Sequence, residues 1–351
     1  MLKTPLSKNL AIIACAGSGK TKSLVDAALE FHNEKILLTT YTHDAKAQIV
    51  LKIKKRLGYV PANIVIKTWQ TFQLQQCVKP YQSFILGNVK IRSIYFENFP
   101  YHLGNGTFLA GRNIYKDKLG QFICISNKLS DGLVVGRLEE IYDHILIDEA
   151  QDLKSYDLDF LKLLFHSKIK VTLVGDPRQR IFQTCNLRYG SRIGFNDWVV
   201  TCSEEGLLDI IEKNITYRCA EDVCKFANTI FPELPQSISH NNNQDDHQGI
   251  IFIPKSCVDE YVKKYSDDDL KLLKFSKSTD TMGYDALNIG LSKGEEYKRI
   301  LIFPTIGMKK FLKSENPLDI GSREKFYVAV TRAKMSIAFV CAKPSKQLSL
   351  L

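Results

Sequence analysis

The sequence has no apolar run of 18 uninterrupted residues, no Cys-X-X-Cys pair, no repeat of fixed period and no low-complexity tail. The first absence excludes an ordinary transmembrane helix, so we expect a cytoplasmic chain without a membrane partner. The second leaves nine scattered cysteines without the close spacing of zinc sites, which indicates free thiols in a reducing compartment. The last two exclude repeat architectures and disordered tails.

Acidic residues are fewer than basic ones: 38 Asp and Glu stand against 48 Lys and Arg, which gives a net charge of +10. This imbalance favours a polyanionic partner such as nucleic acid. The content of 44% hydrophobic and 25% charged residues is that of a soluble globular protein with a sizeable core. A length of 351 residues predicts two domains, or two with an insertion.

Short apolar runs alternate with helical patterns in two blocks, which predicts parallel sheets in two α/β domains. The first block contains expected strands at 10–15, 35–39, 64–67, 144–147 and 170–174, and expected helices at 20–31 and 44–57. The second contains expected strands at 250–253, 299–303 and 336–341, and expected helices at 220–231 and 323–333. Between residues 80 and 142 the pattern weakens and glycines interrupt it, which indicates an insertion.

Residues 14–21, Ala-Cys-Ala-Gly-Ser-Gly-Lys-Thr, join an expected strand to an expected helix. Gly17 and Gly19 would let backbone N–H groups point at phosphate oxygens, and the helix N-terminus adds partial positive charge. Lys20 would neutralise the β and γ phosphates, and the Thr21 hydroxyl would bind Mg²⁺. The strict pattern begins with glycine where this chain has alanine, so a flexible Gly/Ser turn remains the alternative.

Two further strand ends carry polar groups. The expected strand at 144–147 runs into Asp-Glu-Ala-Gln-Asp at 148–152, where Asp148 would hold Mg²⁺ through water and Glu149 would accept a proton from the attacking water. The alternative is an acidic helix N-terminus. A third strand ends in Gly-Asp-Pro at 175–177. Because ligands bind at the carboxyl ends of strands in open α/β sheets, the three segments predict one nucleotide site.

In order along the chain, these motifs resemble those of superfamily 1 DNA helicases of the UvrD/Rep/PcrA type. The segments similar to motifs I, Ia, II, III, IV, V and VI are residues 14–21, 39–42, 148–152, 175–182, 216–218, 292–297 and 327–334. The resemblance implies an α/β fold of two RecA-like parallel-sheet domains with a small insertion in the first. The first domain is then expected at 1–79 and 141–215, the insertion at 80–140 and the second domain at 216–351.

The resemblance also implies roles for individual residues. ATP would be bound by Ala16, Gly17, Ser18, Gly19, Lys20, Thr21, Gln151, Tyr217 and Glu296, with Mg²⁺ held by Thr21 and Asp148. Catalysis would fall to Glu149, Gln179, Arg218 and Arg332. Nucleic acid would contact Thr40, Trp69, Phe72, Phe182 and Lys293.

Within these sets, Gln151 and Gln179 would sense the γ-phosphate, and Arg218 and Arg332 would stabilise charge on the transferring phosphoryl group. Tyr217 would stack on adenine and Glu296 would contact the ribose.

Each role has a structural alternative. Aromatic faces can stack on bases, but Trp69, Phe72 and Phe182 could equally belong to the core, as could Tyr217. Either arginine on its own could be a charge on a helix surface. The basic residues of 52–56, and Arg178 with Arg180, would follow the DNA backbone or simply be solvated.

The chain departs from the family in two places. Only 13 residues precede the loop at 14–21, too few for the family's upstream glutamine motif, so selectivity for adenine is open. The 74 residues between Arg218 and Lys293 leave no room for the large accessory domain. We therefore expect a compact ATP-dependent translocase or helicase on single-stranded DNA, moving 3′ to 5′ and unwinding weakly unless it pairs with a second copy or another protein.

The alternative is a DNA-binding regulatory subunit, gated by nucleotide, of a partner nuclease or of a repair or defence complex.

Overall fold

The computed structural model describes residues 8–100, 102–104, 106–182, 184, 187, 194–314 and 318–342. The chain forms two compact units. Unit 1 consists of Met1–Ile13, Lys20–Pro177 and Phe182–Glu212. Unit 2 consists of Ala14–Gly19, Arg178–Ile181 and Lys213–Leu351.

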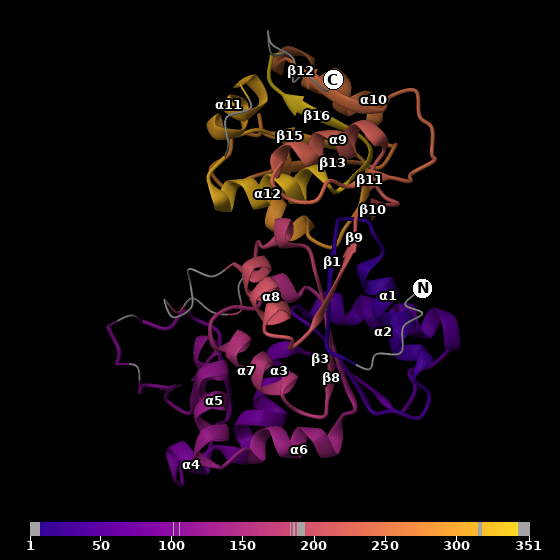
Figure 1. Ribbon diagram of the computed structural model, residues 1–351. Helices are drawn as coiled ribbons and strands as arrows, with labels where there is room; N and C mark the ends of the chain where they lie inside the picture. Colours follow the sequence, from indigo (N-terminus) through magenta and orange to yellow (C-terminus); the bar gives the residue numbers. More distant parts are fainter. Residues whose placement is uncertain are drawn as a thin grey trace. The chain divides into compact units, whose positions relative to one another are not determined.

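Unit 1 contains a six-stranded sheet whose spatial order is β3 (Ile64–Thr68), β2 (Ile36–Thr40), β7 (His144–Ile147), β8 (Lys170–Gly175), β1 (Leu10–Ala14) and β9 (Asp209–Lys213) (Figure 1). The first five strands pair in parallel, with Leu38 opposite Leu146 and Leu10 opposite Thr172. Every residue of β1, β2 and β7 is buried, as continuous apolar strands covered on both faces require.

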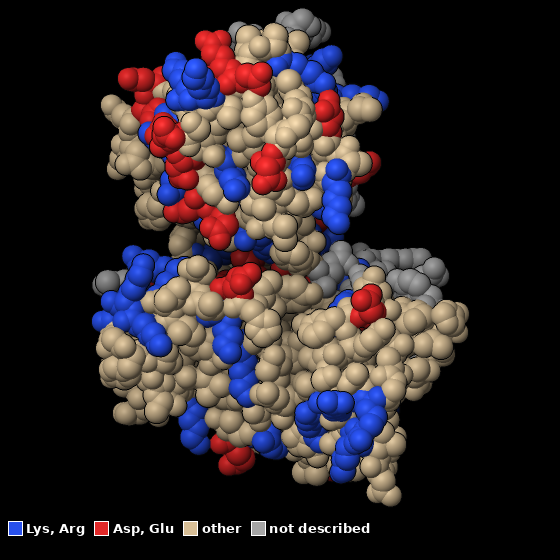
Figure 2. Space-filling view, turned by 180° about the vertical axis from the view of Figure 1, so that it is seen from behind, with Lys and Arg blue, Asp and Glu red and all other residues tan. Residues whose placement is uncertain are grey.

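The larger helices of unit 1 are α1 (Lys20–Glu30), α2 (His43–Leu57), α7 (Tyr156–Phe165) and α8 (Phe195–Glu204). Helix α2 begins where the Thr42 hydroxyl accepts the Ala45 N–H at 3.1 Å, and ends at Gly58 with φ 81°. Only Ile49 and Ile53 of this helix are buried, and its last turn carries three basic residues. In Figure 2, Lys and Arg side chains gather in groups over unit 1.

The region between β3 and β7 is part of unit 1. It contains α3 (Trp69–Phe72), a π-helix (Gln73–Val78), α4 (Ser83–Leu86), α5 (Leu119–Leu129), α6 (Leu133–Ile141) and a small sheet of β4 (Ser93–Tyr95), β6 (Asn113–Tyr115) and β5 (Leu109–Ala110). Phe122 of α5 and Leu138 of α6 belong to the same hydrophobic core as Ile145 of β7. The weak sequence pattern therefore conceals two helices of the unit 1 core.

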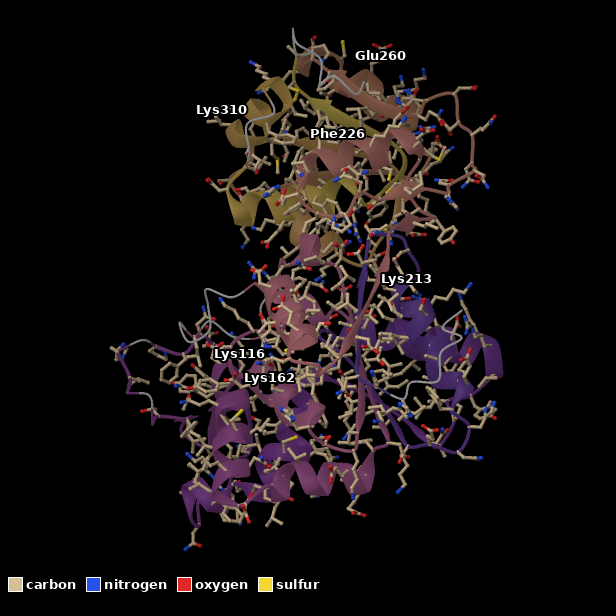
Figure 3. All side chains as sticks on the ribbon, in the orientation of Figure 1. Lys116, Lys162, Lys213, Phe226, Glu260 and Lys310 are labelled. Atoms are coloured by element: carbon tan, nitrogen blue, oxygen red, sulfur yellow. The ribbon has the colours of Figure 1, made fainter. Side chains whose placement is uncertain are left out.

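Unit 2 contains a five-stranded parallel sheet with the order β12 (Gly249–Ile253), β16 (Ala333–Val340), β15 (Tyr297–Phe303), β13 (Leu270–Lys274) and β14 (Leu287–Asn288). Its helices are α9 (Glu221–Ile230), α10 (Val258–Tyr265), α11 (Ile306–Ser314) and α12 (Ile320–Val330). A two-stranded parallel ladder joins β10 (Ile215–Thr216) to β11 (Ile238–Ser239). Phe226 of α9, labelled in Figure 3, packs against Phe326 of α12 and Phe339 of β16.

A charged network also stabilises unit 2. Arg299 in β15 is 3% exposed, and its guanidinium donates to Asp245 Oδ1 at 2.6 Å and to Asp268 Oδ2 at 2.8 Å. Burial would raise the pKa of Asp245, but hydrogen bonds from Arg299, from the His247 N–H and from Lys298 outweigh it and hold this pKa below its ordinary value. A buried arginine thus keeps its carboxylate partners ionised.

The predicted α/β class with two parallel sheets is confirmed. One expected element is displaced: the helix predicted at 323–333 ends at Val330, because Thr331 and Arg332 turn into β16, which begins at Ala333. Among the described residues, no helix is both long enough and apolar enough to span a membrane. The described cysteines are all free thiols.

Candidate nucleotide site

The loop at residues 14–19 packs against the segment that follows β10. Gly17 and Gly19 have φ of 75° and 80°, a backbone conformation that glycine adopts without strain. The Gly17 carbonyl accepts the Tyr217 N–H at 3.0 Å. A Cβ on Gly17 would lie 2.5 Å from Arg218 Cβ and 2.6 Å from Thr216 Oγ1. Glycine is therefore required both for the turn and for this close approach.

Two other loop residues are also buried. Ala16 is 3% exposed and Ser18 is 9% exposed. The Ser18 hydroxyl has no hydrogen-bond partner among the described residues. A buried polar atom without a partner costs free energy unless a ligand satisfies it. The loop thus presents an unsatisfied hydroxyl beside its two glycines, as a phosphate-binding loop would.

The start of α1 and the end of β7 meet in unit 1. The Thr21 hydroxyl donates to Asp148 Oδ2 at 2.8 Å, and Asp148 is 4% exposed. Burial and the neighbouring Glu149 carboxylate raise the Asp148 pKa to about 6, although Thr21 and Lys20 counteract the shift. The two predicted Mg²⁺ ligands are therefore adjacent, in a place where a bound cation would relieve the cost of a buried carboxylate.

Asp176 is a site residue that sequence analysis left without a role. It follows β8, is fully buried, and its Oδ2 lies 3.9 Å from Lys20 Nζ. Because β8 pairs directly with β1, the end of β8 lies beside the strand that carries the phosphate loop. The available signal was an acid directly after a buried strand, in a segment already identified as a ligand-binding turn.

Glu149 and Gln151 are held in one hydrogen-bonded chain. Glu149 adopts φ 57°, which is rare for a residue with a side chain and is typical of strained functional positions. The Gln151 amide donates to the Glu149 carboxylate, and Gln151 Oε1 accepts the Asp176 N–H at 3.1 Å. A Cβ on Gly175 would lie 2.6 Å from Gln151 Oε1. The missing side chain at Gly175 therefore makes room for Gln151.

In unit 2, Arg332 is buried at the turn before β16 and is 1% exposed. Its Nε donates to the Val328 carbonyl and its Nη1 to the Glu295 carbonyl, both at 3.1 Å. Its Nη2 lies 3.5 Å from Gln179 Oε1. The structure thus brings together two residues that were predicted separately, the γ-phosphate sensor Gln179 and the arginine of motif VI.

Arg218 lies in unit 2 beside Glu296. Arg218 Nε donates to Glu296 Oε2 at 3.0 Å, and Arg218 Nη1 donates to the Thr331 carbonyl at 3.1 Å. Lys334 Nζ lies 3.0 Å from the other Glu296 oxygen. Burial raises the Glu296 pKa, but Lys334 and Arg218 more than compensate and the net shift is downward. Glu296 is therefore an ionised bridge between two cations, a contact that the predicted ribose role did not include.

The predicted aromatic contacts separate into two groups. Tyr217 is 61% exposed and makes an edge contact with His240, so its ring is available for stacking and is not a core residue. Trp69 and Phe72 are 1% and 0% exposed and pack against Phe160. Their rings are in the core, the structural alternative left open by the sequence, and offer no face to a base.

The other predicted nucleic-acid residues differ in access. The ring of Phe182 stacks on Tyr41 at a centroid separation of 6.0 Å, and both are half-buried. Thr40, at the end of β2, is buried, and its hydroxyl has no partner among the described residues. Lys293 is half-buried in the turn before β15. Phe182 and Lys293 are therefore each partly exposed, whereas Thr40 is not.

The two basic groups also differ. Arg178 is 4% exposed, donates to the Pro235 carbonyl at 3.1 Å and lies over the Tyr327 ring. Arg180 forms an ion pair with Glu324 at 3.2 Å. These contacts make Arg178 a structural residue of unit 2 and not a phosphate contact. The basic side chains in the last turn of α2 are exposed.

The donor set fits Mg²⁺. This ion prefers oxygen ligands and usually takes one or two from the protein while waters and substrate phosphates supply the others. Thr21 Oγ1 and Asp148 Oδ2 are two such oxygens in contact. No cluster of three or more His, Cys, Asp or Glu side chains that could hold a metal occurs in the described part of the chain. A fully protein-coordinated ion is thus not what these residues offer.

Comparisons with known proteins bear on the family and on the fold. Residues 2–92 and 115–184 match the family model for the UvrD/REP helicase N-terminal domain. Over 256 residues the chain is 27% identical to the Gabija protein GajB of Bacillus cereus (strain VD045), a match covering 67% of this chain and 49% of GajB. The chain thus spans about half the length of this relative.

The fold is similar to the crystal structure of the arterivirus nonstructural protein 10 helicase, with a TM-score of 0.50 and 14% identity. The likeness covers 95% of this chain and 59% of the viral one, and it bears on the fold alone.

Proposed function

We propose that this chain, whose residues 2–92 and 115–184 match the family model for the UvrD/REP helicase N-terminal domain, hydrolyses ATP to move along single-stranded DNA in the 3′ to 5′ direction. The close packing of Gly17 against Arg218 is the observation that supports the proposal most. It brings the Cβ of the predicted motif IV arginine next to the predicted phosphate loop, and an arginine is the group that stabilises charge during phosphoryl transfer.

The hydrolytic step is assigned to groups in unit 1. A water molecule attacks the γ-phosphorus, the bond to the β-phosphate oxygen breaks, and ADP leaves. Glu149 accepts the proton of that water, and its fixed hydrogen bond with Gln151 supports this orientation. Lys20 compensates phosphate charge, and its partner Asp176 positions it. Thr21 and Asp148 would hold Mg²⁺, which when bound neutralises phosphate charge.

Coupling to DNA is assigned to the glutamines and arginines. Gln151 accepts a hydrogen bond from the backbone of Asp176 near the start of motif III, and Gln179, within the same motif, lies beside Arg332. Through these contacts, loss of the γ-phosphate would change the positions of the residues that follow β8 and of the turn before β16. Tyr217, Phe182 and Lys293 supply accessible aromatic and basic groups, which bind single strands through stacking and phosphate contact.

The decisive experiment measures the ATPase rate of the chain without nucleic acid and with single-stranded DNA, double-stranded DNA or RNA. We expect the largest stimulation by single-stranded DNA. Nucleotide binding without stimulated turnover would overturn the translocase and favour a nucleotide-gated regulatory subunit of a nuclease or of a repair or defence complex.

The direction of movement along DNA and the contact with the DNA phosphate backbone are tested separately. Displacement of streptavidin only from the opposite end of a labelled strand would refute 3′ to 5′ movement. Affinity for an oligonucleotide should fall as salt rises, with a logarithmic slope of about −0.7 per phosphate neutralised. A flat response would contradict phosphate tracking. Sedimentation with and without DNA would show whether a second copy assembles on the strand.

A further inference from the structure

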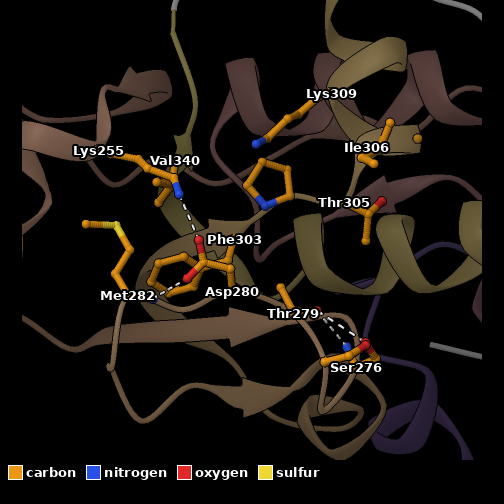
Figure 4. A pocket seen from close by; sticks show the side chains of 13 residues that line it. Lys255, Ser276, Thr279, Asp280, Met282, Phe303, Thr305, Ile306, Lys309 and Val340 are labelled. Carbon is orange, nitrogen blue, oxygen red and sulfur yellow. Dashed lines mark hydrogen bonds and ion pairs between the residues drawn. The ribbon is translucent and has the colours of Figure 1, made fainter.

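The carboxyl edge of the unit 2 sheet carries a pocket that none of the predicted site residues lines. Its volume is about 440 Å³, which is within the range of small-molecule sites. Figure 4 shows it between the segments that follow the strands. We propose that this pocket binds a small molecule that joins one phosphate group to an apolar or aromatic body, as a nucleoside monophosphate does. We call it the switch-point pocket, after its place in the sheet.

The topology favours a ligand at this point. In the strand order of the sheet, β13 and β15 are neighbours. After β13 the chain continues to β14 at one lateral end of the sheet, whereas after β15 it continues to β16, toward the opposite end. Neighbouring parallel strands whose connections diverge leave a crevice outside their carboxyl ends, and this is where open α/β sheets bind ligands. The pocket walls include Ser276 and Thr279, which follow β13, and Thr305, which follows β15.

The charges in the pocket favour an anion. Lys255 forms an ion pair with Asp280 at 2.7 Å, whereas Lys309 of α11 has no ion-pair or hydrogen-bond partner among the described residues. In Figure 4 the Lys309 side chain points toward the pocket interior. The lining therefore holds two cations, Lys255 and Lys309, against one carboxylate, Asp280, whose pKa both lysines help to lower.

The start of α11 adds donors to that charge. The Thr305 hydroxyl accepts the Met308 N–H at 3.2 Å and so caps the helix. The N–H groups of Ile306 and Gly307 have no acceptor among the described residues. Free first-turn N–H groups and the helix dipole favour a negative group, and a lysine beside them favours phosphate.

The remaining walls are apolar, which a lone inorganic ion would not need. Phe303 and Pro304 are buried and form the base with Val340. At the rim, Ile306 is 77% exposed, and Met282 is held at φ 56° by a hydrogen bond from its N–H to Asp280 at 3.0 Å. A strained turn that presents a thioether, opposite an exposed branched side chain, suits an apolar ligand body.

This location is distinct from the predicted nucleotide residues of unit 2. Glu296 directly precedes β15 and Arg332 directly precedes β16, so both lie at the amino edge of the sheet. The switch-point pocket follows the strands, at the carboxyl edge. Its occupancy therefore does not depend on whether the proposed ATPase is correct.

The test labels the methionine methyl groups of the full chain with ¹³C and records their NMR signals during titration. Met282 lines the pocket, and the buried Met308 and Met335 serve as internal references. The probes are inorganic phosphate, phenyl phosphate, thymidine monophosphate and an oligothymidylate. A Lys20→Ala background removes binding at the phosphate loop. We expect both organic phosphates to shift Met282, with affinities at least about tenfold tighter than that of inorganic phosphate.

Three variants separate the contribution of the lysine charge from that of the apolar rim to ligand binding. Lys309→Ala should weaken phenyl phosphate about tenfold, because a charge-assisted contact is lost. Lys310→Ala is the matched control on the same helix, and Figure 3 shows this side chain projecting outward. It should leave the affinity unchanged. Ile306→Ser should weaken phenyl phosphate but not inorganic phosphate.

Two results would overturn the proposal. The first is a Met282 signal that does not move with millimolar organic phosphate, or that moves equally in Lys309→Ala. The second is a shift with oligothymidylate alone, because the pocket would then belong to a nucleic-acid track and not to a small molecule.

Discussion

The predicted site residues lie at opposite edges of the two parallel sheets. In unit 1 the charged groups stand at the carboxyl edge, where Asp148 follows β7 and Asp176 follows β8. In unit 2 the predicted phosphoryl-transfer residues precede the strands, as Arg332 does before β16. Whether an edge is the carboxyl or the amino edge of a parallel sheet therefore does not by itself decide its function. The residues at that edge decide its chemistry.

The edges also differ in how their charges are compensated. At the carboxyl edge of unit 1, Lys20 faces a buried acid, and Asp148 has a raised pKa of about 6. At the amino edge of unit 2, Arg218 faces the ionised Glu296. Unit 1 holds a surplus of buried carboxylate oxygens, which favours a cation, whereas unit 2 presents guanidinium groups, which favour an anion.

The strongest test of the comparison removes an arginine from the unit 2 edge. Arg218→Ala should lower kcat for ATP by about 10³-fold or more, because arginines that stabilise phosphoryl-transfer charge contribute on that scale. ATP binding should change much less, which separates catalysis from affinity. Single-turnover hydrolysis with DNA is the measurement.

Lys225→Ala is the matched control for Arg218→Ala, since it removes an exposed cation of α9 that forms an ion pair with Glu221. Equal rates for the two variants would assign phosphoryl transfer to unit 1 alone.

The next test removes the base from the unit 1 edge. Glu149→Gln should lower kcat by about 10³-fold while ATP remains bound, because a general base contributes between about 10² and 10⁴. Lys20→Ala should instead abolish nucleotide binding, since the loop loses its cation. Binding of a fluorescent ATP analogue beside steady-state turnover distinguishes the two. Hydrolysis by Glu149→Gln at the wild-type rate would refute the assignment of the base.

A smaller effect should separate a structural arginine from a catalytic one. Arg299→Ala should lower the free energy of unfolding by about 3 kcal/mol, because it leaves Asp245 and Asp268 without their buried partner. The Asp245 pKa is held below its ordinary value, so its contribution is full above that value and is lost as pH falls through the lowered pKa.

Urea unfolding at two pH values measures this effect. The difference in the free energy of unfolding between the two pH values should be smaller in Arg299→Ala than in the wild type. In contrast, Lys255→Ala breaks an exposed pair and should cost less than about 1 kcal/mol. A loss in Arg299→Ala no greater than in Lys255→Ala would show that the network is not stabilising.

The smallest effect concerns the close packing at the unit 1 edge. Gly175→Ala should cost about 2 kcal/mol, because its Cβ would meet Gln151 Oε1 at 2.6 Å and the Gln151 backbone N at 3.1 Å. Gly136→Ala is the control, since nothing lies near that position and alanine favours a helix. Thermal unfolding of both variants is sufficient. Equal stability for Gly175→Ala would mean that Gln151 moves freely.

Much of the fold was predictable because the main strands are continuous apolar runs with polar ends. The expected strand at 144–147 is β7 to the residue. Helix α5 was missed because Gly120 looked like a break. Its Cβ would lie 2.9 Å from the backbone N of Asp157, so this glycine allows α5 to approach α7. Strand β13 was missed because its sequence, Leu-Lys-Leu-Leu-Lys, is not an apolar run.

The candidate site was predictable only as far as local motifs extend. Local motifs located Lys20 and Asp148, and the family resemblance pointed to Arg332, but neither could pair Lys20 with Asp176, since that contact depends on β1 and β8 being neighbours. They also could not decide between core and surface for Trp69, because an aromatic side chain after a strand is compatible with both. Burial is a property of the assembled sheet and not of the segment.

Gly17 has a consequence for genetics. Two effects disfavour any larger residue at this position. One is the positive φ of 75°, and the other is the clash of an added Cβ with the Arg218 Cβ. Shortening Arg218 to alanine would keep its Cβ, and the contact with Thr216 Oγ1 at 2.6 Å and the torsional penalty would also remain. Selection for revertants of a Gly17→Ala strain should accordingly recover true back-mutations at that codon and no compensating change at codon 218.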